Sequence, residues 1–191
     1  PIIKLENKIC KTNRKNKILY VGRLSDEKGI FELVEGFEIF NKDFPKFKLD
    51  IVGDGHQRKN LSNFINSKNL NKQIKIIPWT NVINKYYKSS KMLVLPSFFE
   101  GFGNVLIEAL NFNLPCVSNK NDGPKEILAN GKYGLLMRDN KPNTINLSLR
   151  RVIKNYNLYK LKAVKGLKNN QKYCIDVIGK RYFLKISSVL K

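Results

Sequence analysis

The sequence predicts an α/β domain built on a Rossmann-like parallel β-sheet with helices on both faces. Three observations lead to this prediction. Short apolar blocks alternate with segments whose apolar residues recur at helical spacing. The first four blocks end at glycine or proline, which are typical of strand ends. Hydrophobic residues make up 42% of the 191 residues, so the chain is long and apolar enough to form a domain with its own core.

The elements of the first half follow from this alternation. Residues 1–16 are polar and basic, and we expect them to be a linker. Residues 17–22 form an apolar block ending in glycine, which predicts the first strand. Apolar side chains at helical spacing predict a helix over 29–42. A second strand is expected over 47–52, followed by a helix over 57–69.

The same alternation continues along the rest of the chain. The expected elements are strand 73–77, helix 82–89, strand 92–95, helix 104–111, strand 115–118, helix 124–129, strand 133–137 and a helical tail over 143–191. Strands covered on both faces form short continuous apolar blocks, so this pattern favours a parallel sheet. We expect the domain to span 17–172, with a separate C-terminal helix over 173–191.

The chain is strongly basic, with 36 Lys and Arg against 15 Asp and Glu and a formal net charge of +21. The excess of Lys, Asn and Ile is typical of an AT-rich genome, so part of this charge reflects composition alone. A field of this sign still attracts nucleic acid, anionic lipid or phosphorylated substrates, and composition does not choose among them. No run approaches the ~20 apolar residues of a membrane span.

The reactive residue types give few signals outside the strand ends. Cys10, Cys116 and Cys174 show no paired or metal-type spacing, so we interpret them as small apolar side chains in a reducing cytoplasm. His56 has no sequence partner, and we assign it no catalytic role. We find no metal-ligand cluster and predict no metal site. Because the chain begins at Pro1 without an initiator Met, we expect a fragment of a cytoplasmic protein.

Ligands of parallel sheets bind at the carboxyl ends of the strands, so the residues after each strand are the candidates. Arg23 directly follows the first expected strand, and Lys28 lies in the same loop. Two cations there can neutralise a diphosphate. The alternative is that both are solvated, which fits Lys28 alone better than Arg23, because arginine is scarce in this chain. Gly53, after the second strand, permits either an ordinary turn or close approach to a ligand.

The segment after the fourth strand gives the strongest signal. Gly101 and Gly103 lead into the helix that begins at Asn104, and free N–H groups at such a helix start bind anions. Glu100 lies just outside this helix, and Glu108 lies about one and a half turns inside it. Carboxylates accept hydrogen bonds from paired sugar hydroxyls. The alternative has Glu100 as a charge at the helix start and Glu108 as a solvated side chain, but the joint pattern favours binding.

The loop after the fifth strand contains Gly123 and Pro124, which suit the first turn of a helix. This helix start is either a second source of N–H groups for a ligand or an ordinary capped helix.

Five segments in a fixed order between Ile18 and Leu136 resemble a known family. They are Gly-Arg-Leu at 22–24 with Lys-Gly at 28–29, Val-Gly-Asp-Gly at 52–55, the E-x7-E pattern at 100–108, Gly-Pro-Lys-Glu-Ile-Leu at 123–128, and Asn-Gly-Lys-Tyr-Gly-Leu-Leu at 130–136. Together they resemble the C-terminal domain of group 1, family 4 retaining glycosyltransferases. That family has the GT-B fold, made of two Rossmann-like domains.

The resemblance implies a role for each matching residue. Arg23 and Lys28 would hold the donor diphosphate, and these two with Glu100 would form the catalytic set. Glu100 would contact hydroxyls of the transferred sugar, and Glu108 would bind the ribose hydroxyls. The remaining donor-binding residues would be Gly22, Gly53, Gly101, Phe102, Gly103, Asn104, Val105, Gly123 and Pro124, with Trp79 and Thr80 near the base. Trp79 fits core packing equally well.

The resemblance also implies a reaction. The donor would be a UDP-sugar or GDP-sugar, cleaved without a metal by front-face attack with retention, as the protein stabilises charge on the leaving diphosphate. The acceptor would be a glycan or a lipid-linked glycan of a bacterial surface polysaccharide, bound by an N-terminal domain that this chain lacks. Helix 173–191 would pack toward that domain, and the basic surface would meet anionic lipid at the inner face of the plasma membrane.

Two other function classes fit parts of the sequence. A nucleotide-sugar epimerase shares the architecture, but the ordered motif set argues against it. A non-enzymatic binder of nucleic acid or membrane fits the charge. No nucleic-acid recognition pattern occurs, however, so we expect no nucleic-acid partner.

Overall fold

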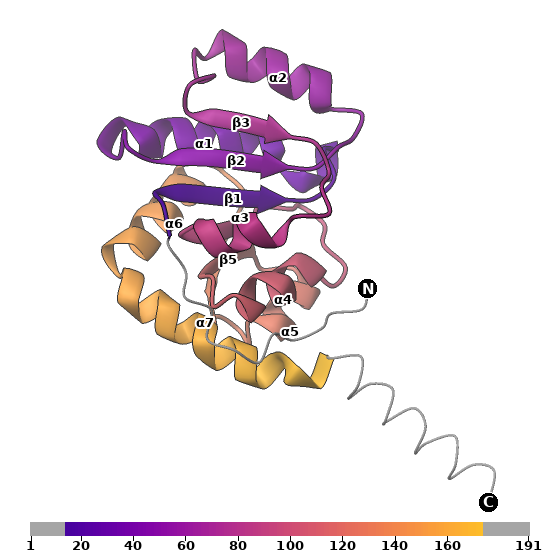
Figure 1. Cartoon of the computed structure of the whole chain (residues 1–191), viewed down its shortest axis with the longest axis vertical. Helices are drawn as coiled ribbons and strands as arrows, with labels where there is room; N and C mark the ends of the chain where they lie inside the picture. The colour runs from indigo at the N-terminus through magenta and orange to yellow at the C-terminus, as the bar shows by residue number, and fades with distance from the viewer. Residues whose placement is uncertain (1–13, 174–191) are drawn as a thin grey trace, which may run out of the picture.

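The computed structural model describes residues 14–173 as a three-layer α/β fold (Figure 1). Six parallel strands form one sheet in the order β3-β2-β1-β4-β5-β6. The strands are β1 Lys17–Val21, β2 Lys48–Val52, β3 Ile74–Ile77, β4 Met92–Leu95, β5 Cys116–Asn119 and β6 Leu135–Met137. This arrangement confirms the predicted fold class.

The helices form two groups. They are α1 Ile30–Asp43, α2 Arg58–Ser67, α3 Asn84–Ser89, α4 Asn104–Asn111, α5 Asp122–Ile127, α6 Pro142–Lys154 and α7 Tyr156–Asn170. Helix α1 contacts α2 and α6, whereas α4 contacts α5 and α7. Figure 1 shows α1 behind the strands and α3 and α4 in front of them. Right-handed crossovers explain this division, because the chain reverses its direction of travel across the sheet after β3.

The strand order makes β1 and β4 neighbours although they lie far apart in the sequence. Strand β2 is added on one side of β1 and strand β5 on the far side of β4. The sheet therefore has its topological switch point between β1 and β4, where the loops that follow them open a crevice for ligands.

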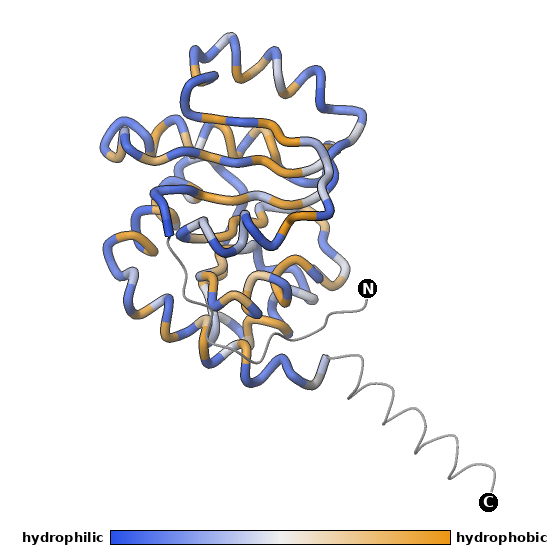
Figure 2. The backbone as a smooth tube through the Cα atoms, in the orientation of Figure 1, coloured by the Kyte–Doolittle hydropathy of each residue, from blue (hydrophilic) through white to orange (hydrophobic). Residues whose placement is uncertain are grey.

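The apolar blocks of the sequence form the core of the sheet. Figure 2 shows them as hydrophobic runs along the strands, whereas the helices alternate between polar and apolar residues. Residues 18–21 of β1 and 92–95 of β4 are buried. Burial of both faces accounts for the continuous apolar pattern that predicted these strands.

Several predicted boundaries shift in the structure. The strand over 92–95 and the helix over 104–111 are confirmed without change. The tail is not one continuous helix, because Asn155 leaves helical geometry and separates α6 from α7. Asparagine competes with the helix by bonding locally, and here its side-chain amide donates to Arg151 O. Almost all of the C-terminal helix predicted over 173–191 lies outside the described residues.

Arg14, near the end of the predicted linker, is tied to the domain. Its guanidinium donates to Tyr87 O and Ser90 O at the end of α3, at 3.1 and 2.6 Å. It also donates to Phe112 O and Asn113 O just after α4, at 2.6 and 3.2 Å. The C-terminal ends of helices leave carbonyl groups unpaired and carry partial negative charge. One cation thus satisfies the ends of two helices.

We expect Arg14→Ala to lower the free energy of unfolding by about 2 kcal/mol, because bonds to a charged donor contribute more than neutral ones. Urea denaturation measures the change. Lys15→Ala is the matched control, since this exposed side chain makes no hydrogen bond or ion pair among the described residues. A loss from Arg14→Ala no larger than that of the control would contradict this role.

Candidate donor site

The loops after β1 and β4 lie against each other at the switch point. Phe98 N donates to Glu27 O at 2.8 Å, which joins the two loops through their backbones. Gly29 has a φ of +62°, and a Cβ added to it would lie 2.3 Å from Pro96 O. Only glycine fits a left-handed conformation so close to a neighbouring carbonyl. The Lys-Gly pair of the sequence motif thus sets the distance between the two loops.

Lys28 and Glu100 form an ion pair across this junction. Lys28 Nζ lies 3.0 Å from Glu100 Oε2, and the two side chains are only 13% and 16% exposed. Ser97 Oγ donates to the same carboxylate oxygen at 3.1 Å. Partial burial reduces screening by water and salt, so the pair holds both side chains in fixed positions. The sequence nominated both residues but did not predict that they would touch.

Arg23 lies at the open rim of the same loop. Its side chain is 78% exposed, and its guanidinium lies 3.5 Å from Glu27 Oε1. An exposed pair at this distance is weak. Arg23 is therefore free to swing toward a ligand, unlike Lys28.

The start of α4 lies beside Glu100. Gly103 precedes the helix, and Asn104 and Val105 form its first turn. No carbonyl among residues 14–173 accepts a bond from the N–H groups of Asn104 or Val105. Such unpaired groups, together with the helix dipole, attract anions. The chain from Gly101 to Phe102 is exposed at this mouth.

Helix α5 packs directly against this mouth. A Cβ on Gly123 would lie 2.2 Å from Gly101 O and 2.4 Å from Phe102 O, so no side chain fits there. Pro124, in the first turn of α5, is buried. The loop at 101–103 and the start of α5, both nominated by the sequence, are therefore in contact. The close packing indicates that Gly123 supports this loop.

Two asparagines missed by the sequence reasoning hold this loop in place. Asn119 Nδ2 and Asn121 Nδ2 both donate to Ser97 O, at 3.1 and 2.9 Å. Asn119 ends β5, so the amide spans from one strand end to the next. Their position directly after a strand is a signal that could have nominated them.

Glu108 has a specific partner. Its Oε2 accepts a hydrogen bond from the hydroxyl of Tyr87 in α3, at 2.7 Å. Tyr87 is fully buried and stacks on Phe112 with ring centroids 5.6 Å apart. Glu108 is thus held by a rigid phenol and is not a freely solvated side chain. Nothing in the local sequence pairs residues 87 and 108.

The remaining candidates lie along the carboxyl edge of the sheet. Gly22 N donates to Val52 O and Gly53 N donates to Ile77 O, so both glycines continue the sheet beyond β1 and β2. Trp79 is 64% exposed, which excludes the alternative that it packs in the core. Thr80 Oγ1 accepts from the backbone N–H of residue 82 at 3.3 Å.

Two further sequence interpretations concern metal and membrane. His56 is exposed and its Nε2 lies 3.1 Å from an Asp26 carboxylate oxygen. Within residues 14–173, no three His, Cys, Asp or Glu side chains cluster as metal ligands would. None of the helices in this range is long and apolar enough to cross a membrane.

Comparison with known families now identifies the chain. The model of the family described as glycosyl transferases group 1 matches residues 2–173. The chain belongs to this family. The resemblance seen in the sequence is thereby confirmed at the level of the family.

Curated relatives agree with this assignment. An uncharacterized glycosyltransferase of Haemophilus influenzae is 33% identical, with 91% of this chain and 49% of the relative covered. The amylovoran biosynthesis glycosyltransferase AmsD of Erwinia amylovora is 31% identical, with 88% of this chain and 47% of the relative covered. The chain thus spans about half the length of the curated relatives it matches.

Solved structures share the fold. S. aureus TarM, in a complex that contains UDP, superposes with a TM-score of 0.86 at 24% identity, covering 95% of this chain and 37% of TarM. The C-terminal domain of LpcC, a group 1 family glycosyl transferase from Francisella tularensis, gives 0.75 at 26% identity, covering 86% of this chain and 89% of that domain. The Rossmann-like half of a GT-B fold is thereby confirmed.

The Tyr87 contact leads to a prediction about alkaline pH. Burial, and then the Glu108 carboxylate, raise the pKa of Tyr87 well above its usual value. The unfolded chain releases this proton near pH ~10 whereas the folded chain keeps it. Stability from this group is therefore complete below pH ~10 and falls as the pH rises from there toward the folded pKa.

We expect the free energy of unfolding of the unmodified chain to fall more steeply above pH ~10 than that of Tyr87→Phe, by about 1.4 kcal/mol per pH unit. Urea denaturation between about pH 9 and 11.5 measures both slopes. Tyr20→Phe is a matched comparison, because burial also raises the pKa of Tyr20, and it should give a similar change. Parallel curves for the unmodified chain and Tyr87→Phe would contradict the raised pKa.

Proposed function

We propose that residues 17–172 are the nucleotide-sugar donor domain of a retaining glycosyltransferase, with the donor lying across the carboxyl edge between β1 and β4. The observation that carries this proposal is the Lys28 and Glu100 pair beside the unpaired first turn of α4. A cation, a carboxylate and a helix N-terminus together complement the phosphates and the hydroxyls of one ligand. UDP-sugar is the donor class we favour over GDP-sugar, since the TarM complex contains UDP.

In this proposal the diphosphate lies between Lys28, Arg23 and the N–H groups of Phe102 to Val105. Negative charge grows on the leaving diphosphate as the bond to the sugar breaks, and prearranged cations stabilise it. Lys28 is already fixed, whereas the exposed Arg23 would close on the phosphates when the donor binds. We expect no metal requirement, because these side chains supply the positive charge.

The sugars would be held by the two carboxylates. Glu100 would accept from hydroxyls of a transferred hexose or N-acetylhexosamine, and Glu108 from the two ribose hydroxyls. The Tyr87 bond occupies one oxygen of Glu108 and leaves the other available. Exposed Trp79 and Thr80 would lie near the base. The glycines at 22, 53 and 101 would let the backbone approach the donor, and Gly123 with Pro124 would support the loop at 101–103 against which the donor binds.

The acceptor would be bound elsewhere. Because the chain spans about half of its relatives, we propose that an N-terminal domain outside this sequence binds a glycan or a lipid-linked glycan. The relationship to AmsD supports a role in bacterial surface polysaccharide synthesis, in the cytoplasm at the inner face of the plasma membrane. Residues 173–191 would pack toward that domain.

The ribose contact tests the proposal most simply. We expect Glu108→Gln to weaken UDP binding about tenfold, or ~1.4 kcal/mol, because a charged acceptor is lost, and to leave binding of 2′,3′-dideoxy-UDP unchanged. Isothermal titration calorimetry measures both. Glu32→Gln on α1 is the matched control and should change neither. Equal affinity of the unmodified chain and Glu108→Gln for UDP would overturn the assignment.

We also expect the 191-residue chain to bind donor weakly and to transfer no sugar, because in this proposal the acceptor side of the cleft belongs to the part of its relatives that this sequence does not span. A donor screen with the full-length protein and a lipid-linked acceptor pool should give product where this chain gives none. Robust sugar transfer by the chain alone would contradict the proposal that this chain binds only the donor and another domain binds the acceptor.

A further inference from the structure

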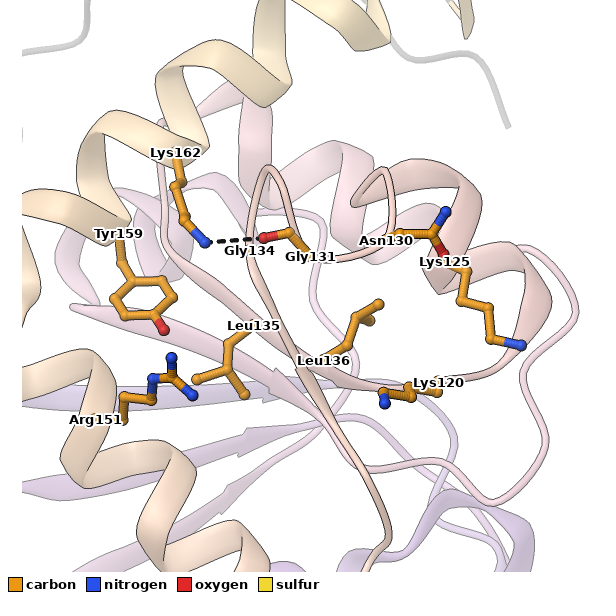
Figure 3. Close-up of a pocket in the computed structure, with 10 residues that line it drawn as sticks. All are labelled: Lys120, Lys125, Asn130, Gly131, Gly134, Leu135, Leu136, Arg151, Tyr159 and Lys162. Atoms are coloured by element: carbon orange, nitrogen blue, oxygen red, sulfur yellow. Dashed lines mark hydrogen bonds between the residues drawn. The ribbon is translucent and has the colours of Figure 1, made fainter.

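A second hollow lies beside the edge strand β6, outside the proposed donor site. It has a volume of about 440 Å³, and its floor includes Leu135 and Leu136. Figure 3 shows Arg151, Tyr159 and Lys162 on one side of these leucines and Lys120 and Lys125 on the other. Four cations thus line one hollow, and they come from the loop after β5 and from α5, α6 and α7.

These cations are poorly neutralised. Lys125 pairs with Asp122 at 3.2 Å, but no carboxylate among residues 14–173 pairs with Lys120, Arg151 or Lys162. Lys162 Nζ instead donates to Gly131 O at 2.9 Å. Burial, and then the charge of Arg151, lower the pKa of Lys162. Arg151 and Lys162 line the same hollow, so their positive charges repel each other, and a bound anion would relieve this repulsion.

The surrounding sequence strengthens this positive field. From residue 140 to residue 173 there is no Asp or Glu, whereas Lys and Arg recur throughout. This segment forms α6 and α7, which supply Arg151, Tyr159 and Lys162. A basic composition alone would scatter cations over the surface. Here they gather at a hollow, with a buried tyrosine ring 5.2 Å from Lys162 Nζ.

The hollow is distinct from the proposed donor site. Lys28 and Glu100 lie at the ends of β1 and β4, whereas β6 is two strands further along the sheet. Adjacent strands are ~4.8 Å apart, so this offset is about 10 Å before the loops are considered. A ligand bound in the hollow beside β6 would therefore not occupy the position proposed for the donor phosphates.

We propose that this hollow binds a phosphate group belonging to a ligand other than the sugar donor. Arg151 offers a planar fork to two phosphate oxygens, and Lys162 adds a point charge beside it. Figure 3 shows the Tyr159 hydroxyl turned toward Arg151 and Leu135, where it would donate a third bond. The phosphate belongs either to a soluble molecule or to a lipid headgroup. Exposed Leu158 and Leu161 on α7 make the lipid source worth testing.

Binding is tested by two-dimensional amide NMR of the 191-residue chain titrated with inorganic phosphate at constant ionic strength. We expect saturable shifts at Gly131 to Leu136 and at Lys162, with little change at Gly101 to Val105. UDP should instead shift Gly101 to Val105 and leave Gly131 to Leu136 and Lys162 little changed. The phosphate titration therefore tests the hollow, and the UDP titration tests the donor site independently. Small, unsaturable shifts spread over many lysines would overturn the proposal.

The matched variants are Arg151→Gln and Lys154→Gln, which remove one charge each from α6. Lys154 is exposed and does not line the hollow. We expect Arg151→Gln to weaken phosphate binding about tenfold and Lys154→Gln to change it less than twofold. Arg151 makes no side-chain bond among the described residues, so its loss should leave the fold intact. Equal effects of the two variants would show a general charge effect and overturn the site.

The source of the phosphate is decided by sedimentation with vesicles of phosphatidylglycerol and phosphatidylcholine. A lipid headgroup source predicts binding to phosphatidylglycerol vesicles that Arg151→Gln loses and Lys154→Gln keeps. A soluble source predicts that both variants sediment alike while only Arg151→Gln loses inorganic phosphate. If neither ligand distinguishes the two variants, the proposal is wrong.

Discussion

The Lys28 and Glu100 pair depends on the strand order of the sheet and in turn fixes the candidate donor site. In a parallel sheet the loops of β1 and β4 become neighbours only because the chain reverses direction after β3. The reversal brings a cation and a carboxylate that are 72 residues apart to 3.0 Å. Removing either partner would leave a largely buried charge uncompensated. The pair therefore constrains which conformation the two loops adopt more than it adds to stability.

Backbone and amide contacts hold this pair from several directions. Ser97 is fully buried, donates to Glu100, and has its own carbonyl fixed by Asn119 and Asn121. Gly29 permits close approach of the loop after β4 from one side. The unpaired N–H groups of Asn104 and Val105 at the start of α4 thereby lie beside a charged pair. Prearranged dipoles of this kind lose little when a polar ligand binds.

The sequence predicted the architecture because the strands are apolar blocks and the first four have a clear stop. Strand β4 is bounded by Pro96, and its limits were predicted without error. The predicted ends of the helices were less accurate. Asparagines such as Asn155 end helices through local hydrogen bonds, and hydrophobic periodicity does not reveal these bonds. The loops that carry candidate site residues were also predicted, because ligands of parallel sheets lie at strand ends.

The contacts among those residues could not be predicted. Tyr87 and Glu108 lie 21 residues apart, and Arg14 meets carbonyls up to 99 residues away, so neither pairing leaves a local pattern. The cations of the hollow beside β6 come from four separate segments of the chain, and in so basic a sequence nothing distinguishes them from ordinary surface cations. Long-range contacts of this kind depend on the folded topology.

The most direct test of the account is the affinity of Glu100→Gln for UDP and for UDP-glucose, measured by calorimetry on the 191-residue chain. The account predicts that UDP-glucose binding weakens about tenfold, because the sugar loses its charged acceptor. UDP binding should stay equal or improve, because Lys28 is released from its carboxylate partner to meet the phosphates. An equal loss for both ligands, or no change for UDP-glucose, would contradict the central role of this pair.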